Sequence, residues 1–133
     1  LTGWNALIRF RRMFGLFAFF YATMHWSVYL WLDQSFDWIA IAKDIVKRPF
    51  ITVGMLTFTL LLALAITSTN GMQRRMGFDN WQKLHRAVYV AGILAVLHFW
   101  WLVKLDTTWP FIYALMLAAL LGVRLYWKAR ARA

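Results

Sequence analysis

The chain has 133 residues, of which 62% are hydrophobic and 15% charged, and its formal net charge is +10. Soluble domains are about 45–50% apolar and about 25% charged, so a water-soluble core of this size has no room for so much apolar surface. The sequence has no cysteine, which excludes disulfides, thiolate metal sites, iron–sulfur clusters, thiol catalysis and a cofactor attached through a C-x-x-C-H motif. Composition therefore favours a membrane protein.

Four long uncharged segments predict four transmembrane helices. In chain order, we expect these helices at about 10–32, 50–69, 84–104 and 109–128. Each is close to the roughly 20 residues that cross a bilayer core of about 30 Å as a helix. The segments lack the apolar–polar alternation of barrel strands. The predicted fold is an all-α integral membrane protein, a four-transmembrane-helix bundle with one domain over residues 1–133.

The connections between the predicted helices carry turn and capping residues. Pro49 suits the first turn of the second helix, and residues 67–71 are suited to end it. Between the first two helices, apolar residues recur at helical spacing opposite charged ones: Trp38, Ile41, Ala42 and Ile45. This pattern predicts a short amphipathic helix at about 37–46 that lies on the outer membrane surface.

The charges orient the predicted bundle. The whole net charge of +10 falls on the side that holds both termini, whereas the charges on the other side sum to zero. The positive-inside rule therefore predicts that both termini are cytoplasmic. The basic excess is then a topology signal that also contacts membrane lipid headgroups, and a nucleic-acid partner is not needed to explain it.

Ionisable residues inside the predicted spans are functional candidates. His25 and His98 each lie about 22 Å, at 1.5 Å per residue, into helices that run in the same direction, so their imidazoles reach one depth. Arg11 and His85 match in the same way near the other side of the membrane. The sequence therefore predicts two levels, an outer one with His25 and His98 and an inner one with Arg11 and His85.

Paired imidazoles among apolar, aromatic helices favour haem. Zinc needs a fuller set of ligands than either level offers, and copper prefers cysteine or methionine. Haem needs only two axial ligands, and two imidazoles leave no open position, which favours electron transfer over oxygen activation. Without cysteine, the haem is b-type. Its propionates would find cations at both levels: Arg9, Arg12 and Arg86 at the inner level, and Lys47, Arg48 or Lys104 at the outer level.

The rotation of these residues about their helices is less uniform. Arg11 and His25 deviate by only about 40° from a whole number of turns, so they share a face. His85 and His98 fall about 140° apart on an ideal helix. Supercoiling or local overwinding, for example around Gly92, has to bring them into line.

Other functions remain open on these residues alone. In a cofactor-free membrane scaffold or transporter subunit, the histidines would be structural contacts between helices. In a quinone-oxidising enzyme, a histidine near the interface would assist proton release. The tryptophans near the span ends are typical of an aromatic belt: Trp4, Trp81, Trp100, Trp101, Trp109 and Trp127.

Several separated motifs resemble the ferric-reductase-like transmembrane domain, and within it the MsrQ family. They are RRMFGL at 11–16, YATMH at 21–25, KRPFITVG at 47–54, LAITST at 64–69, WQKLHR at 81–86 and LHFW at 97–100. The resemblance implies a multi-pass protein of the bacterial inner membrane that binds one or two b-type haems. Because such proteins carry two further spans before the position of Leu1, we expect this chain to be a piece of a longer one.

The resemblance also implies partners. Electrons would pass from the quinone pool or a cytoplasmic flavin reductase to the periplasmic molybdopterin reductase MsrP, which reduces oxidised methionines in proteins. FMN is a second cofactor associated with the family. In the wider superfamily two histidines occupy the first of these helices, whereas the inner position here is Arg11. Weak ligation by Arg11, a ligand from elsewhere and a flavin are the alternatives for the inner level.

Overall fold

The computed structural model describes residues 10–131, which are helical and contain no strand. In chain order the elements are α2 (Arg11–Val28), the π-helical turn η1 (Tyr29–Asp33), α3 (Trp38–Lys47), α4 (Pro49–Ile66), α5 (Asn70–Met76), α6 (Phe78–His85), α7 (Ala87–Leu102) and α8 (Thr108–Arg130). By length and composition, four segments can cross a membrane: Arg11–Asp33, Pro49–Ile66, Phe78–Leu102 and Thr108–Arg130. The predicted all-α fold with four candidate spans is therefore confirmed.

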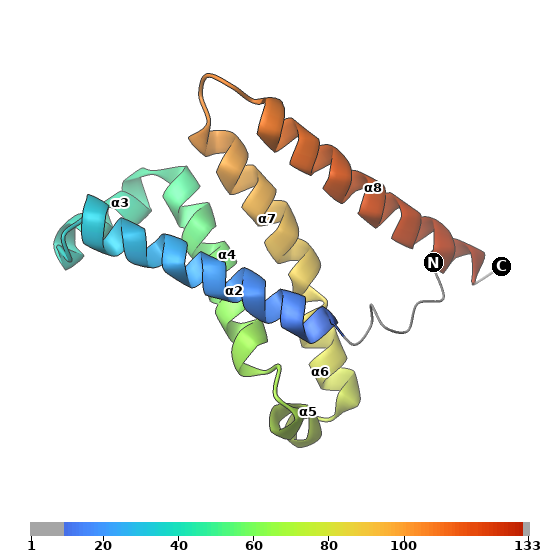
Figure 1. The fold of residues 1–133 in the computed structure, drawn as a ribbon. Coiled ribbons are helices and arrows are strands. Elements are labelled where there is room, and N and C mark those ends of the chain that lie inside the picture. The colour runs from blue at the N-terminus through green and yellow to red at the C-terminus, as the bar shows by residue number, and fades with distance from the viewer. Residues whose placement is uncertain (1–9, 132–133) are drawn as a thin grey trace.

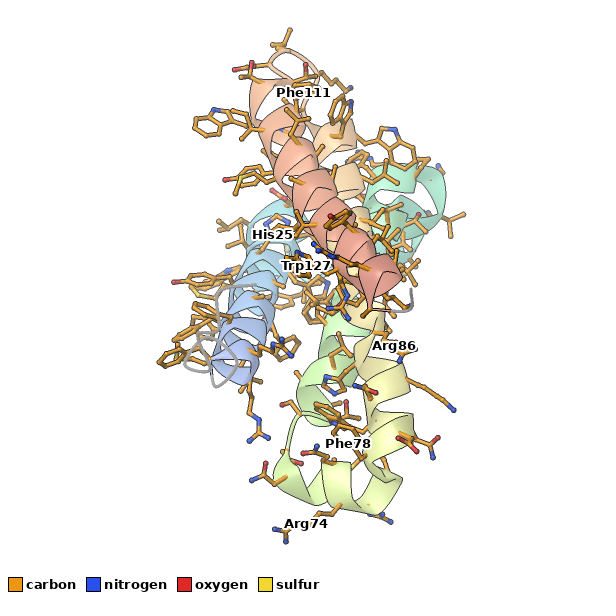
Figure 2. All side chains as sticks on the ribbon, turned by 90° about the vertical axis from the view of Figure 1, so that its right-hand side faces the viewer. His25, Arg74, Phe78, Arg86, Phe111 and Trp127 are labelled. Carbon is orange, nitrogen blue, oxygen red and sulfur yellow. The ribbon has the colours of Figure 1, made fainter. Side chains whose placement is uncertain are left out.

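Helix α4 is the central element of the bundle. It packs most extensively against α7 and also contacts α2 and α3, whereas α8 packs on α7. Figure 1 shows α8 on the far side of α7 from α4. The end of the bundle where α3 lies, and where α4 begins and α7 ends, is called the α3 end below. At the opposite α5 end, α5 and α6 project beyond the end of α8 (Figures 1 and 2).

The first span ends in a π-helical turn and a sharp reversal of the chain. The amide of Gln34 donates to the carbonyl of Tyr29 over 3.1 Å, which closes the wide turn. Ser35 and Phe36 then adopt positive φ angles of 45° and 61°, a left-handed conformation that residues with side chains seldom adopt. Asp37 starts α3 as its N-cap. This route returns the chain over the α3 end so that α4 can run back beside α2.

The connection from α4 to α6 differs from the predicted turn at 67–71. Thr69 accepts a hydrogen bond from the amide of Met72 over 3.2 Å and so caps the short helix α5. Gly77 has φ 79° and ends α5, and this conformation suits glycine because glycine has no Cβ. Helix α6 then begins at Phe78, so the third apolar segment starts earlier than the expected residue 84.

The third segment is interrupted at Arg86, between α6 and α7. The carbonyl of Arg86 accepts a hydrogen bond from the amide of Tyr89 over 3.1 Å, a tight turn rather than a helical one. The expected adjustment near Gly92 is therefore not where the helix breaks. Gly92 lies inside α7, where a Cβ would come within 3.6 Å of Leu117 on α8. A Cβ there would make an ordinary van der Waals contact.

Few apolar side chains are buried in the described part of the chain. The buried hydrophobic residues are Leu30, Ile41, Leu64 and Ala91, whereas large apolar side chains along α2 and α8 are exposed. In water such a surface would be unstable, but it suits a lipid environment, in which each helix pairs its own backbone hydrogen-bonding groups.

The connection between α7 and α8 contains a carboxylate that accepts hydrogen bonds. The hydrogen bonds from Thr108 lower the pKa of Asp106 and so favour its ionised carboxylate.

Candidate cofactor-binding site

A cavity of about 570 Å³ lies between α2, α4 and α7. Volumes of about 300–1,000 Å³ are typical of cofactor and small-molecule sites. Its space comes partly from small residues at the contact of the three helices, and the small lining residues are Ala18, Ala22, Gly54 and Ala95. These small side chains therefore leave an apolar cavity between the helices, where larger side chains would fill the space.

Two histidines face each other across this cavity. His25 comes from α2 and His98 from α7, and their ring centres are 6.2 Å apart with the planes inclined by 75°. A metal ion bound by two imidazoles makes two metal–nitrogen bonds of about 2 Å each. When the distance from each nitrogen to its ring centre is added, the two ring centres lie about 6 Å apart. The structure thus brings together, at a separation of this size, the two residues that were expected at one depth. His25 lies midway along the bundle in Figure 2.

The ring of His98 is oriented by the backbone of α4. Its Nδ1 lies 2.6 Å from the carbonyl oxygen of Phe50. A carbonyl can only accept, so Nδ1 carries the hydrogen and donates it. The lone pair of the neutral ring is then on Nε2, as in metal-binding histidines whose other nitrogen donates to a backbone carbonyl.

A glycine makes this orientation possible. A Cβ built on Gly54 would come within 2.8 Å of Cε1 and 2.9 Å of Nδ1 of His98. No side chain fits there, because such distances are well inside van der Waals contact. Gly54 therefore lets the imidazole lie against the α4 backbone within reach of the Phe50 carbonyl.

The wall of the cavity contains a polar atom without a partner. The Nε1–H of Trp26 is buried, and no described residue accepts a hydrogen bond from it. Its ring stacks on Phe58 with centres 5.1 Å apart, and Phe58 stacks on Phe19 with centres 5.8 Å apart. Buried donors normally find an acceptor.

His85 has different surroundings at the α5 end. Its Nε2 lies 3.1 Å from Oγ1 of Thr67, and its ring stacks on Trp81 with centres 4.1 Å apart. The indole of Trp81 also donates to the carbonyl of Thr67 over 2.8 Å. Trp81 is half-buried and packs on His85.

The hydroxyl of Thr67 lies between a backbone carbonyl and His85. This hydroxyl donates its one hydrogen to the carbonyl of Ala63, 2.7 Å away. It accepts from Nε2 of His85 when that nitrogen carries the hydrogen of the ring, and Nδ1 then holds the lone pair.

In the described part of the chain, no hydrogen bond joins His85 to the arginines predicted for the inner level. Arg11 is exposed, and no described hydrogen bond joins it to His85. Arg12 donates to Oδ1 of Asn70 over 2.5 Å and so ties α2 to α5. Arg86 is exposed at the α6–α7 junction, nearer the α5 end than His25 (Figure 2). Arg9 lies outside the described residues, as does Trp4.

Four residues with clear roles in these contacts were not predicted from the sequence. They are Trp26, Phe50, Gly54 and Thr67. A glycine within an otherwise large-residue apolar helix is a signal of close approach, and it was available for Gly54. Phe50 acts through its backbone carbonyl, which carries no sequence signal.

The comparisons with known proteins agree with this architecture. Residues 1–96 match the family described as the ferric reductase like transmembrane component. The chain belongs to this family of multi-pass membrane proteins.

Its relatives narrow the resemblance further. The chain is 54% identical to a protein-methionine-sulfoxide reductase heme-binding subunit MsrQ from Herminiimonas arsenicoxydans, over 99% of the chain and 62% of that protein. It is 56% identical to the MsrQ of Xanthomonas campestris pv. campestris strain 8004, over 99% of the chain and 60% of that protein. The resemblance to MsrQ is confirmed, and the chain spans about 60% of the length of these relatives. No solved structure matches the chain.

Proposed function

We propose that this chain binds b-type haem between His25 and His98 and carries electrons across a bacterial inner membrane. The observation that carries the proposal is the pair of imidazoles facing each other across the cavity, with ring centres 6.2 Å apart. Relatives of similar sequence are named heme-binding subunits. The net charge of +10 supports an orientation with both termini in the cytoplasm.

The residues present fit a haem. His98 presents Nε2 because Phe50 holds Nδ1, and His25 faces it from α2. Trp26 also lines the cavity. When bound, haem supplies one-electron redox chemistry, and two imidazole ligands suit electron transfer because they leave no iron position open. The chain's own residues would hold the haem through His25 and His98, orient the His98 ring through Phe50 and line the cavity mostly with apolar side chains.

The partners of the chain follow from its relatives. Their name places MsrQ in a protein-methionine-sulfoxide reductase system. We infer that electrons leave toward the periplasmic reductase MsrP for repair of oxidised proteins. The donor is the quinone pool or a cytoplasmic flavin reductase, and FMN is the candidate second cofactor. Because the chain spans about 60% of these relatives, these roles belong to the longer protein.

A second haem at the α5 end would use His85, with Arg11 as its partner or as a propionate contact. The hydroxyl of Thr67 occupies Nε2 of His85. Ligation through Nε2 therefore requires His85 to leave Thr67, whereas ligation through Nδ1 does not. Haem content distinguishes one site from two, because the second site raises the ratio from one haem per chain to two.

The His25–His98 assignment is tested with purified His98→Ala, His25→Ala and His85→Ala variants. We expect the first two changes each to remove the absorbance of a bis-histidine haem, and His85→Ala to leave the spectrum of that haem in place. A pyridine haemochrome assay gives haem per chain. An unaltered Soret band and haem content in His98→Ala would overturn the assignment.

The alternative of a cofactor-free scaffold or transporter subunit is favoured by one observation. His98 and His85 each make a hydrogen bond to another helix, through Phe50 and Thr67, and such contacts stabilise membrane bundles. This alternative predicts a colourless purified protein with no haem in the haemochrome assay. The haem proposal predicts at least one haem per chain.

A further inference from the structure

The two ends of the cavity differ in the charge of their lining residues. The two charged residues of its lining, Asp33 and Arg48, both belong to the α3 end, where η1 finishes and α4 begins. Toward the other end the lining is apolar, with Ala18 and Leu61. A ligand with one charged edge and one apolar edge would therefore place its charged edge at the α3 end, because burying a charge among apolar groups is costly.

Arg48 is held in place by a carboxylate that is itself anchored. Nε of Arg48 lies 3.5 Å from Oδ1 of Asp44, and the Asp44 side chain is 17% exposed whereas that of Arg48 is 56% exposed. The other oxygen of Asp44 accepts from Gln34 over 2.8 Å and from Tyr29 over 3.3 Å. Asp44 thus joins α3 to the end of the first span and orients the Arg48 side chain at the cavity mouth.

The terminal nitrogens of Arg48 remain available for a ligand. Asp44 engages Nε, and no described residue accepts a hydrogen bond from either Nη atom. A guanidinium presents its donors as a planar fork that matches a carboxylate. The other cations expected at this level, Lys47 and Lys104, do not line the cavity.

We infer that Arg48 is a positioning residue that binds one propionate of the haem and so sets which edge of the haem faces the α3 end. The inference rests on the proposed haem function. Asp33 also reaches the mouth, and its negative charge disfavours a carboxylate beside it. Arg48 would therefore hold one propionate.

The test compares haem with haem dimethyl ester, in which both carboxylates have lost their charge. The full-length protein is produced under haem limitation and titrated with each compound, and the Soret band reports binding. A charge-assisted carboxylate contact predicts that the wild-type protein binds haem about tenfold more tightly than the ester. Arg48→Gln should reduce this preference toward one, whereas the matched control Lys47→Gln should keep it.

Two further readouts separate a specific contact from a general loss of structure. Arg48→Lys should retain part of the preference, because lysine keeps the charge but not the planar fork. In Arg48→Gln the midpoint potential should fall, because removing a nearby positive charge disfavours the added electron. An Arg48→Gln protein with the wild-type preference and potential would overturn the Arg48 assignment alone. A wild-type protein that gives no Soret band with either compound would overturn the haem proposal itself.

Discussion

At the scale of single residues, the contact between Gly54 and His98 controls the geometry of the site. The imidazole lies so close to the α4 backbone that a Cβ at position 54 would come within 2.8 Å of it. The same approach lets Nδ1 reach the carbonyl of Phe50. Because Gly54 has no Cβ, the His98 ring can adopt the orientation that leaves Nε2 as the proposed ligand nitrogen.

Gly54→Ala should therefore displace the His98 ring and weaken haem binding. Overpacking a close contact costs about 1–3 kcal/mol, here acting on the proposed ligand. Gly122→Ala is the matched control, because a Cβ at Gly122 on α8 meets no atom within 4 Å. Haem per chain and the Soret maximum are the measurements. Equal haem content in the two variants would contradict the proposed role of Gly54.

Thr67 is the second residue whose removal has a specific expected effect. Its hydroxyl joins α4 to His85 over 3.1 Å, so Thr67→Val leaves Nε2 of His85 without this partner. We expect the free energy of unfolding in detergent to fall by about 1 kcal/mol. The control is Thr59→Val, because the Thr59 hydroxyl bonds only within its own helix, to Met55. A loss of the same size in both variants would show that the contact with His85 adds no stability.

At the scale of elements, the α3 end is organised by caps and by one carboxylate network. Asp37 accepts from the amides of Ile39 and Ala40 over 3.0 Å each and starts α3. Asp44 lies further along α3. It accepts a hydrogen bond from the hydroxyl of Tyr29, which ties α3 to the end of the first span. The orientation of α3 and the position of Arg48 at the cavity mouth therefore depend on each other.

Asp37→Ala should loosen α3, because two amides lose their acceptor at a cost of about 1 kcal/mol. Hydrogen exchange should accelerate in α3 while the amides of α7 stay protected. Asp79→Ala serves as a control, because Asp79 lies in the first turn of α6 and does not cap α3. Unchanged exchange in α3 of the Asp37→Ala protein would contradict this role for the cap.

At the scale of the whole molecule, charge and lipid exposure are the dominant features. The described bundle leaves most large apolar side chains on its surface, which suits residence in a bilayer. Most of the described basic residues lie on α5, on or next to α6, at the start of α2 or in the last part of α8. This distribution supports the proposed orientation, in which both termini and the α5 end lie on the cytoplasmic side.

Because the chain has no cysteine, single-cysteine variants report this orientation without background. Lys43→Cys on α3 should react with a membrane-impermeant maleimide in spheroplasts, whereas Arg75→Cys on α5 should react only after the membrane is permeabilised. Both positions are exposed, so accessibility in the folded protein is matched. Labelling of Arg75→Cys alone in sealed spheroplasts would reverse the proposed orientation.

Some features of the site follow from local patterns. The depth of His25 and His98 depends on 1.5 Å of rise per residue along apolar helices, and their meeting was predicted on that basis. The pairing of Arg11 with His85 was predicted in the same way and stays a prediction. The α5 helix and the break at Arg86 were missed, because capping by Thr69 and the Gly77 turn depend on how the chain crosses from α4 to α6.

The amino-acid sequence by itself determined the class of this protein, its four apolar spans and the residues that meet in the bilayer, because hydrophobic length and helical rise are local properties. Only the tertiary structure decided how those residues are held. The Phe50 carbonyl, the space at Gly54 and the contact between Thr67 and His85 each join different helices. Such contacts depend on the packing distance and rotation of neighbouring helices, and the residues of one helix do not specify these.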